Sequence, residues 1–176
     1  MFFAQTEPFI TAPTLKKRIT ELGAELTQRY KEEKDLVIIC TLKGSILFVA
    51  DLMREIDLPL EVDFISVASY HGGLTSGQLQ VVHGMTTQIT HRPVLIVEDI
   101  VDTGRTLKKL KEMISEGNPR SIEVCALLDK PSRRLVEIEA DYVGFTIEDL
   151  FVVGYGLDYQ QRYRNLPYIG VLSDPQ

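Results

Sequence analysis

The sequence predicts an α/β fold in which helices cover both faces of a mostly parallel central sheet. First, short and nearly continuous apolar segments alternate along the chain with segments of helical periodicity. Second, polar clusters follow three of the strand segments, at 42–44, 98–106 and 129–130. Ligands bind outside the carboxyl ends of the strands in such sheets, so these clusters are expected at one edge. The length of 176 residues suits a single domain over residues 1–176.

The first half of the chain predicts helix, strand, helix and strand in that order. Apolar residues at every third or fourth position indicate an amphipathic helix over about residues 12–34. Residues 36–40 are continuously apolar, as in a buried strand, and residues 46–53 have a helical pattern. Alternating apolar residues predict a strand over 60–69. The segment 69–77 is rich in Gly, Ser and Thr and is predicted to be a loop.

The second half continues the alternation. Residues 94–97 predict a central strand, and residues 106–116 predict a helix that ends at a Gly-Asn-Pro sequence. Another buried strand is predicted over 122–128. Shorter apolar segments, which complete the predicted strands, are 142–145, 151–155 and 169–172.

Composition limits the partners and the location that we expect. The net charge of −6 argues against broad affinity for nucleic acids or anionic membranes. No apolar segment approaches the roughly 18 residues of a membrane span. The N-terminus lacks a signal-peptide pattern, so a cytoplasmic protein is expected. Cys40 and Cys125 lie in apolar strand segments and are expected to be buried, reduced thiols.

Three carboxylates, Glu98, Asp99 and Asp102, follow the strand predicted at 94–97. Such a group of acids is unfavourable unless a cation or a polyhydroxylated ligand lies beside it. The Thr-Gly-Arg-Thr sequence at 103–106 opens the next helix, and its hydroxyls and free amides suit a phosphate. Acids for a metal and a sugar beside a phosphate-binding turn indicate a ribose-phosphate site.

Each of these residues also has a plainer interpretation. Glu98 and Asp99 could form a solvated strand end. Because adjacent strand residues point to opposite faces, these two can serve one ligand only if the chain bends where the strand ends. Asp102 could simply cap the helix. The rest of the turn could be ordinary helix-start residues with one surface cation: Thr103, Gly104, Arg105 and Thr106.

Residues 94–107 resemble the phosphoribosyl-pyrophosphate motif of type I phosphoribosyltransferases. Other segments are similar to the same family in order and spacing, so the resemblance covers roughly residues 36–172. They are a pyrophosphate loop at Leu42-Lys43-Gly44, the start of a catalytic loop at Ser69-Tyr70, a purine-reading segment at 127–130, and a base-stacking and magnesium segment at 151–159 with Arg164. The resemblance implies the fold of that family, with a small hood formed by the chain termini.

The resemblance also implies a purine-salvage reaction. The 5-phosphoribosyl group of phosphoribosyl pyrophosphate would move to N9 of a 6-oxopurine such as hypoxanthine or guanine, with release of pyrophosphate and with Mg²⁺ as cofactor. The implied metal ligands are Glu98, Asp99 and Asp158. The residues implied to bind ribose and phosphate are Glu98, Asp99, Asp102, Thr103, Gly104, Arg105 and Thr106. Those implied to bind pyrophosphate are Leu42, Lys43, Gly44 and Arg164.

For the purine, the resemblance implies Asp102 as general acid or base at N7, and Tyr70 as a residue of the closing catalytic loop. Lys130 is only a donor, so it favours a 6-oxo over a 6-amino group; alternatively it is an exposed loop lysine. Phe151 is implied to stack on the base; alternatively it is a core aromatic. Tyr155 fits the core better than a ligand site. The implied purine-binding residues are Lys130, Phe151, Val152 and Asp158.

Other functions stay open at this point. The same fold could take orotate, uracil, adenine or xanthine as its base. An RNA-binding regulator on this fold would need an extended basic face, which the net charge and the lack of arginine clustering beyond Arg133-Arg134 disfavour. The resemblance implies a homodimer or homotetramer.

Overall fold

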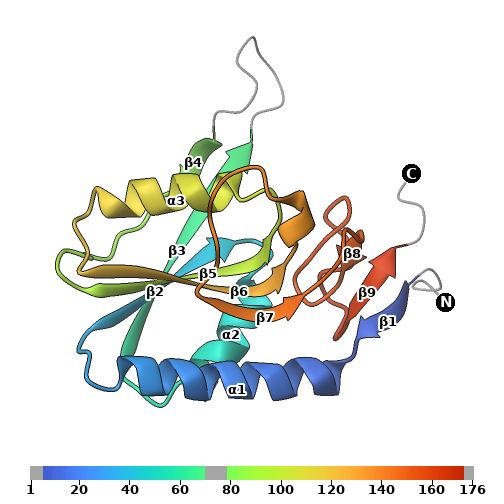
Figure 1. Ribbon diagram of the computed structural model, residues 1–176, viewed down its shortest axis with the longest axis horizontal. Helices are drawn as coiled ribbons and strands as arrows, with labels where there is room; N and C mark the ends of the chain where they lie inside the picture. The colour runs from blue at the N-terminus through green and yellow to red at the C-terminus, as the bar shows by residue number, and fades with distance from the viewer. Residues whose placement is uncertain (1–5, 70–78, 173–176) are drawn as a thin grey trace, which may run out of the picture.

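A six-stranded sheet forms the centre of this computed structural model, which describes residues 6–69 and 79–172 (Figure 1). The strands are β2 (Leu36–Leu42), β3 (Leu60–Ser69), β4 (Leu79–His83), β5 (Pro93–Val101), β6 (Ser121–Asp129) and β7 (Tyr142–Thr146). Their order in the sheet is β4-β3-β2-β5-β6-β7. β3 and β4 are antiparallel, and the other neighbouring pairs are parallel. The predicted α/β fold with a mostly parallel sheet is confirmed.

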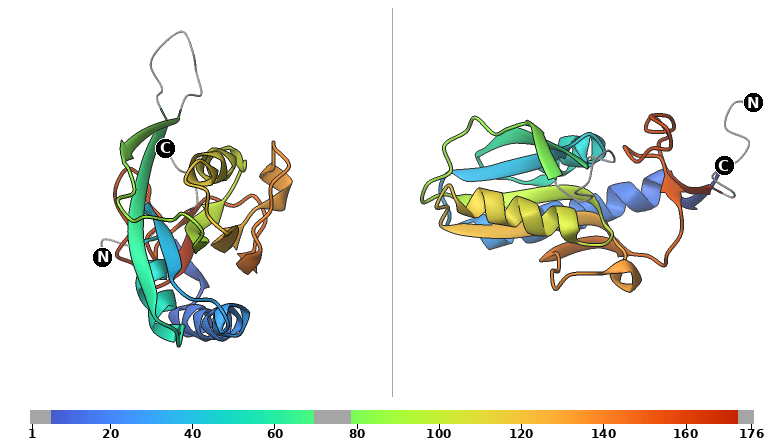
Figure 2. Two further views of the ribbon diagram at one scale, coloured as in Figure 1. Left: turned by 90° about the vertical axis from the view of Figure 1, so that its left-hand side faces the viewer. Right: turned by 90° about the horizontal axis from the view of Figure 1, so that it is seen from above.

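Helices lie on both faces of the sheet (Figure 2). Side chains that alternate along each strand divide the core into two layers, one on each face. In β2, Ile38 packs in the layer formed with α1 (Ala12–Tyr30) and α2 (Ile46–Glu55). Its neighbour Ile39 packs in the layer formed with α3 (Arg105–Ser115). Both isoleucines are completely buried. Coverage on both faces is the reason why the central strands are continuously apolar.

The two ends of the described chain meet in a second, three-stranded sheet. It contains β1 (Thr6–Ile10), β8 (Val152–Val153) and β9 (Ile169–Leu172), with β9 in the middle and antiparallel pairing throughout. Figure 1 shows this small sheet beyond the end of the central sheet toward which β6 and β7 run. It is the predicted hood, and it lies at the carboxyl edge of the parallel strands, where the polar clusters follow.

Two element boundaries differ from the prediction. α1 ends at Tyr30 rather than near residue 34, because Glu33 N–H donates to the Tyr30 carbonyl and closes a turn there. β5 continues past Val97 to Val101, because its pairing with β6 extends as far as Val101 and Asp129. The carboxylates of the acidic motif therefore begin inside the strand and not after it.

Several smaller expectations can also be compared with the structure. The strand predicted over 151–155 is reduced to the two residues of β8, and β1 and β4 were not predicted. Of the loop predicted over 69–77, only Ser69 is described, as the last residue of β3. Cys40 and Cys125 are buried and unpaired, as predicted. Across the described parts of the chain, every helix is too short or too polar to cross a membrane.

Candidate active site

Glu98 and Asp99 occupy consecutive positions near the end of β5, so their side chains point to opposite faces of the sheet. The bend expected between strand and motif is absent, since β5 runs on to Val101. Both residues nevertheless contribute to the lining of one pocket of about 310 Å³ together with Thr103 and Gly104. Because α3 starts directly after this turn, the pocket joins the acids to the N-terminus of a helix.

Glu98 is buried next to β2. It is 7% exposed, and its Oε2 accepts a hydrogen bond from Thr41 Oγ1 at 2.5 Å. Its Oε1 has no hydrogen-bond partner in the described parts of the chain. Burial raises the pKa of Glu98 to about 8; the nearby Asp99 adds to this shift, and the bond from Thr41 opposes it. The interpretation of Glu98 as part of a solvated strand end is therefore wrong.

Asp99 packs against the loop that follows β2. A Cβ atom added to Gly44 would lie 1.6 Å from Asp99 Oδ2, so a residue larger than glycine would displace this carboxylate. Burial raises the pKa of Asp99 to about 6. Backbone hydrogen bonds and the charge of Arg164 act against that shift, and the charge of Asp158 adds to it. The fold thus brings Asp158 and Arg164 within electrostatic reach of Asp99.

The segment after β8 completes this side of the site. Arg164 Nη2 forms an ion pair with Asp158 Oδ1 at 2.8 Å, and Arg164 Nη1 donates to the Gly156 carbonyl at 2.7 Å. Gly156 has a φ of +99°, and a Cβ atom on it would lie 2.0 Å from the Gly44 carbonyl oxygen. This close backbone contact brings Arg164 to the loop after β2. Of the residues predicted for pyrophosphate, Arg164 and Gly44 are thus connected through Gly156, and Leu42 and Lys43 directly precede Gly44 in the chain.

The turn from β5 into α3 has the features of an anion site. Gly104 is the N-cap residue with a φ of +81°, and no side chain caps this end of α3. Thr103 Oγ1 accepts a hydrogen bond from Arg105 N–H at 3.5 Å, and Thr106 follows in the first helical turn. The free amides of a helix start favour a phosphate. Because Gly104 occupies the cap position, the interpretation of Asp102 as a helix cap is wrong.

The end of β6 brings Lys130 beside this turn. Lys130 N–H donates to the Val101 carbonyl at 3.0 Å. The residue is only 7% exposed, and its Nζ donates to the Leu150 carbonyl at 2.6 Å, so it is not an exposed loop lysine. Asp102 Oδ1 accepts a hydrogen bond from Arg133 Nε at 3.0 Å. Lys130 and Asp102, which the family resemblance assigns to O6 and N7 of a purine, therefore follow the neighbouring strands β6 and β5.

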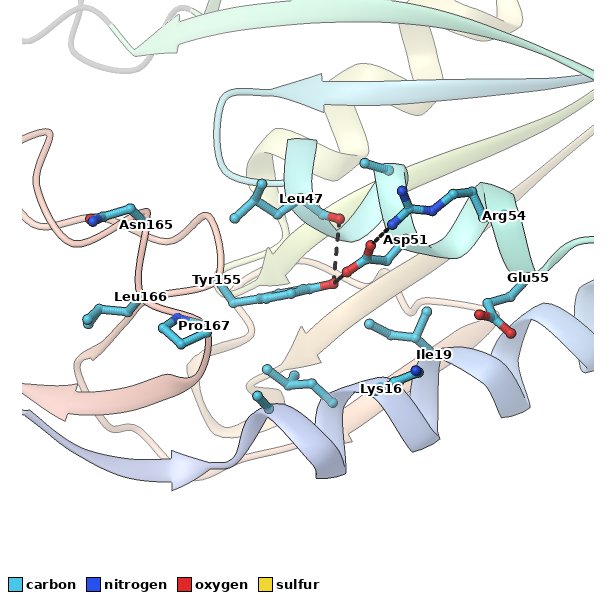
Figure 3. Close-up of a pocket in the computed structure, with 13 residues that line it drawn as sticks. Lys16, Ile19, Leu47, Asp51, Arg54, Glu55, Tyr155, Asn165, Leu166 and Pro167 are labelled. Carbon is cyan, nitrogen blue, oxygen red and sulfur yellow. Dashed lines mark hydrogen bonds and ion pairs between the residues drawn. The ribbon is translucent and has the colours of Figure 1, made fainter.

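Phe151 is 43% exposed, so the interpretation as a core aromatic is wrong. Its ring meets Tyr159 edge to face, with the centroids 5.6 Å apart. Val152 follows within β8 and is buried. Tyr155 belongs to the core, as predicted, and its hydroxyl donates to a carboxylate oxygen of Asp51 on α2 (Figure 3). The exposed ring of Phe151 is therefore available to a ligand, and Val152, the next residue, is buried in β8.

Tyr155 also borders a second pocket, of about 670 Å³, between α1, α2 and residues 165–167 (Figure 3). The lining mixes apolar side chains such as Ile19 and Leu47 with the charged Lys16 and Arg54. None of the predicted site residues contributes to it. The hydrogen bond of Tyr155 instead connects the segment after β8 to α2, the helix that follows the loop at Lys43 and Gly44.

Two contacts of the site were missed by reasoning from sequence. Thr41 contacts Glu98, and the available signal was its position directly before Leu42. Arg133 contacts Asp102, although the sequence analysis considered it only as one of a pair of arginines. Tyr70 lies outside the described residues, so its role stays a prediction.

The carboxylates of the site are candidate ligands for a metal ion. No set of three or more His, Cys, Asp or Glu side chains is arranged for a metal in the part of the chain that the structure describes. Mg²⁺ usually binds one or two carboxylates and completes its octahedral shell with waters and substrate phosphates. The unpaired Oε1 of Glu98 and the carboxylates of Asp99 and Asp158 fit such an ion.

The site combines the carboxylates at the end of β5, the uncapped N-terminus of α3 and Lys130 at the end of β6. Residues 9–160 match the phosphoribosyl transferase domain. That match covers most of the chain, so the protein belongs to the phosphoribosyl transferase domain family.

Relatives with high identity span nearly the whole chain. The sequence is 47% identical over 166 residues to a hypoxanthine phosphoribosyltransferase of Salmonella typhimurium, covering 93% of both chains. It is 53% identical over 155 residues to a hypoxanthine-guanine phosphoribosyltransferase of Streptococcus pneumoniae, covering 88% of this chain and 86% of the other. A crystal structure of a hypoxanthine phosphoribosyltransferase from Staphylococcus aureus superimposes with a TM-score of 0.92 at 46% identity, covering 98% of this chain and 94% of the other.

Proposed function

We propose that this protein transfers the 5-phosphoribosyl group of phosphoribosyl pyrophosphate to N9 of hypoxanthine or guanine and releases pyrophosphate. The products would be IMP and GMP, which makes the reaction one of purine salvage. The names of the relatives support this choice of base. The proposal depends chiefly on one observation, the hydrogen bond from Lys130 N–H to the carbonyl of Val101, a residue that lines the acidic pocket. Lys130, whose ammonium group can only donate, therefore follows β6 next to this pocket.

The donor substrate divides into three parts that match three parts of the site. The 5-phosphate binds the amides and hydroxyls of the turn at 103–106. The ribose hydroxyls bind Glu98 and Asp99, and Oε1 of Glu98 accepts no hydrogen bond from the described residues. The pyrophosphate binds the loop at 42–44 together with Arg164, which supplies the positive charge on that side.

We propose Mg²⁺ as the cofactor, held by Glu98, Asp99 and Asp158 together with substrate oxygens. When bound, the ion neutralises the pyrophosphate leaving group and orients the ribose oxygens. Burial raises the pKa of both Glu98 and Asp99, which supports this assignment, because a metal ion would supply positive charge that offsets the cost of burying the carboxylates.

The purine is oriented by side chains at the ends of β5 and β6. Asp102 accepts the proton of N7 as N9 attacks C1 of the ribose. Lys130 donates to O6 and has no acceptor for the amino group of adenine. Phe151 stacks on the face of the base, a contact that contributes about 1–3 kcal/mol in nucleic-acid complexes. From the family resemblance, Tyr70 would belong to a loop that closes over the ribosyl group and excludes water.

We also propose that the protein acts in the cytoplasm as a homodimer or homotetramer of one domain over residues 1–176. The exposed apolar residues Ile46, Leu47 and Met53 of α2 offer a surface for such an assembly. Light scattering coupled to size-exclusion chromatography measures the mass directly. A monomer at micromolar concentration would refute the assembly.

The proposed reaction is tested by pyrophosphate release from phosphoribosyl pyrophosphate and Mg²⁺ with one base at a time. Hypoxanthine and guanine should support release, whereas adenine should not. Xanthine is the informative fourth base, because only its additional 2-oxo group distinguishes it from hypoxanthine. Release with adenine at the rate seen with hypoxanthine, or no release with any base, would refute the proposal.

A further inference from the structure

Four charged side chains of alternating sign connect the two residues assigned to the purine edge. Arg133 Nε donates to Asp102 Oδ1 at 3.0 Å, and Arg133 Nη1 donates to Asp149 Oδ2 at 3.2 Å. Asp149 Oδ1 in turn lies 3.8 Å from Lys130 Nζ. We call this set, Asp102–Arg133–Asp149–Lys130, the charge bridge. It joins the ends of β5 and β6 to the segment that precedes Phe151.

Three of the four side chains in the charge bridge are too exposed for their ion pairs to contribute much to folding. The side chains of Asp102, Arg133 and Asp149 are 40%, 45% and 51% exposed. Ion pairs with this exposure contribute about 0–1 kcal/mol to stability. The adjacent Arg134 differs, since it is 15% exposed and forms an ion pair with the equally buried Asp129. Arg134 therefore stabilises this turn, and Arg133 remains available for another role.

The ends of the charge bridge match one edge of a 6-oxopurine. N7 and O6 are neighbours on that edge, so a protein that contacts both must hold an acceptor for the N7 proton and a donor for O6 at a fixed separation. Arg133 binds Oδ1 of Asp102, and Oδ2 makes no hydrogen bond within residues 6–69 and 79–172. One oxygen of Asp102 is thus fixed by the protein, and the other is open to a ligand.

We propose that Arg133 and Asp149 are positioning residues that orient Asp102 toward N7 and Lys130 toward O6 of the purine. This inference rests on the proposed function, because it uses the assignment of Asp102 and Lys130 to that edge. Arg133 holds the carboxylate of Asp102 in the direction in which it receives the N7 proton. Asp149 anchors Arg133 from the other side and keeps Lys130 next to it.

Steady-state kinetics of the full chain with hypoxanthine, phosphoribosyl pyrophosphate and Mg²⁺ tests this role. Arg133→Gln should lower kcat/KM for hypoxanthine about 10-fold to 100-fold, as expected when a catalytic group moves by roughly 1 Å. The KM for phosphoribosyl pyrophosphate should stay the same, because that substrate binds elsewhere in the site. Arg120→Gln is the matched control, since Arg120 is 49% exposed and pairs with Glu33 at the opposite end of β6. It should change neither constant.

Two further measurements distinguish positioning from a structural effect. Asp149→Asn should lose part of the activity, and the double variant with Arg133→Gln should lose about as much as Arg133→Gln alone, because the two residues act as one unit. Guanidinium ion at millimolar concentration should restore activity to Arg133→Ala and not to Asp102→Asn. The melting temperature of each variant should stay that of the wild type.

The outcomes separate this inference from the proposed function. A wild-type protein that forms no nucleotide from hypoxanthine would refute the function itself. An active wild type with unchanged kcat/KM in Arg133→Gln would overturn the positioning role alone. A loss of affinity for phosphoribosyl pyrophosphate in that variant would overturn it too, as would a lowered melting temperature without restoration by guanidinium.

Discussion

Asp63 in β3 and Glu98 in β5 are equally buried but differently surrounded. They are 6% and 7% exposed. Burial alone would raise the pKa of Asp63, but three backbone hydrogen bonds of 2.7 Å each lower it below its ordinary value. Glu98 accepts one hydrogen bond within the described residues, and burial raises its pKa to about 8. The donors to Asp63 are the N–H groups of Phe64, Thr86 and Thr87.

The difference in hydrogen bonding shows that the protein itself supplies donors to the carboxylate of Asp63 but few to that of Glu98. Asp63 fastens the segment at 86–87 to β3, so its carboxylate is part of the structure. The described residues supply Glu98 with fewer donors than its carboxylate can accept. Such an arrangement costs stability and is typical of a site that a ligand completes. We therefore expect substitutions of the site acids to affect activity, and substitution of Asp63 to affect folding.

Asp102→Asn should have the largest effect of all on turnover. Without a carboxylate to accept the N7 proton, kcat should fall by about 10²–10⁴-fold. Asp102 is 40% exposed, so the free energy of unfolding should change by less than about 1 kcal/mol. Single-turnover kinetics and a separate binding measurement with phosphoribosyl pyrophosphate check both parts. If the variant also loses affinity for phosphoribosyl pyrophosphate, the role assigned to Asp102 is wrong.

Lys130→Ala should weaken the choice between 6-oxo and 6-amino purines. A hydrogen bond from a charged donor contributes about 1.5–3 kcal/mol, so the preference for hypoxanthine over adenine should fall roughly 10-fold to 100-fold. The ratio of kcat/KM for the two bases measures this preference. Lys109→Ala, on the exposed face of α3, is the control and should leave the ratio unchanged. If the ratio were unchanged in Lys130→Ala, Lys130 would have no role in recognition of the base.

Asp63→Asn should show the opposite behaviour to the site variants. The amide keeps one acceptor but places an NH₂ group against backbone donors, which should lower the free energy of unfolding by about 1–3 kcal/mol. Because the pKa of Asp63 is lowered on folding, its stabilisation is present above the ordinary pKa and is lost as pH falls through the folded value. Urea unfolding at neutral and acidic pH tests this, with the exposed Asp57→Asn as control. If Asp63→Asn had normal stability and a reduced kcat, Asp63 would have a role in activity and not in folding, contrary to this comparison.

The unliganded protein should become less stable as pH rises from 4.5 to about 8, the interval over which folded Glu98 keeps a proton that the unfolded chain has lost. The slope from this group is at most about 1.4 kcal/mol per pH unit. Glu98→Gln should flatten the dependence, because glutamine does not titrate. Denaturation at two pH values within the interval measures the slope. The same slope in both proteins would show that Glu98 is not protonated there.

Elements and motifs made of neighbouring residues could be predicted from the sequence. Contacts between residues far apart in the chain could not, because they depend on how the strands pair and how the turns run. The alternation at residues 60–69 is local, and β3 has those bounds. The acids and the turn at 98–106 are adjacent in the chain, so their common pocket was accessible to the same reasoning. The contact between Thr41 and Glu98 spans 57 positions and follows from the pairing of β2 with β5. The contact between Arg133 and Asp102 spans 31 positions and depends on the path of a turn.

The edge strands show the same limit. β1 contains Glu7 and Pro8 and alternates poorly, and it is a strand because it pairs with β9 near the other end of the chain. The two residues of β8 likewise extend because they pair with β9. The hood could therefore be expected from the family resemblance but not from the pattern of its residues.

Isothermal titration of phosphoribosyl pyrophosphate in the presence of Mg²⁺ tests most directly whether the acidic corner serves this ligand. We predict that the wild-type protein binds it and that Asp99→Asn weakens binding about 10-fold or more, since charge-assisted contacts of roughly 1.5–3 kcal/mol are lost. Asp63→Asn, which removes a buried acid outside this corner, should bind as the wild type does. Wild-type affinity in Asp99→Asn would contradict the assignment of this corner to the pentose and its metal.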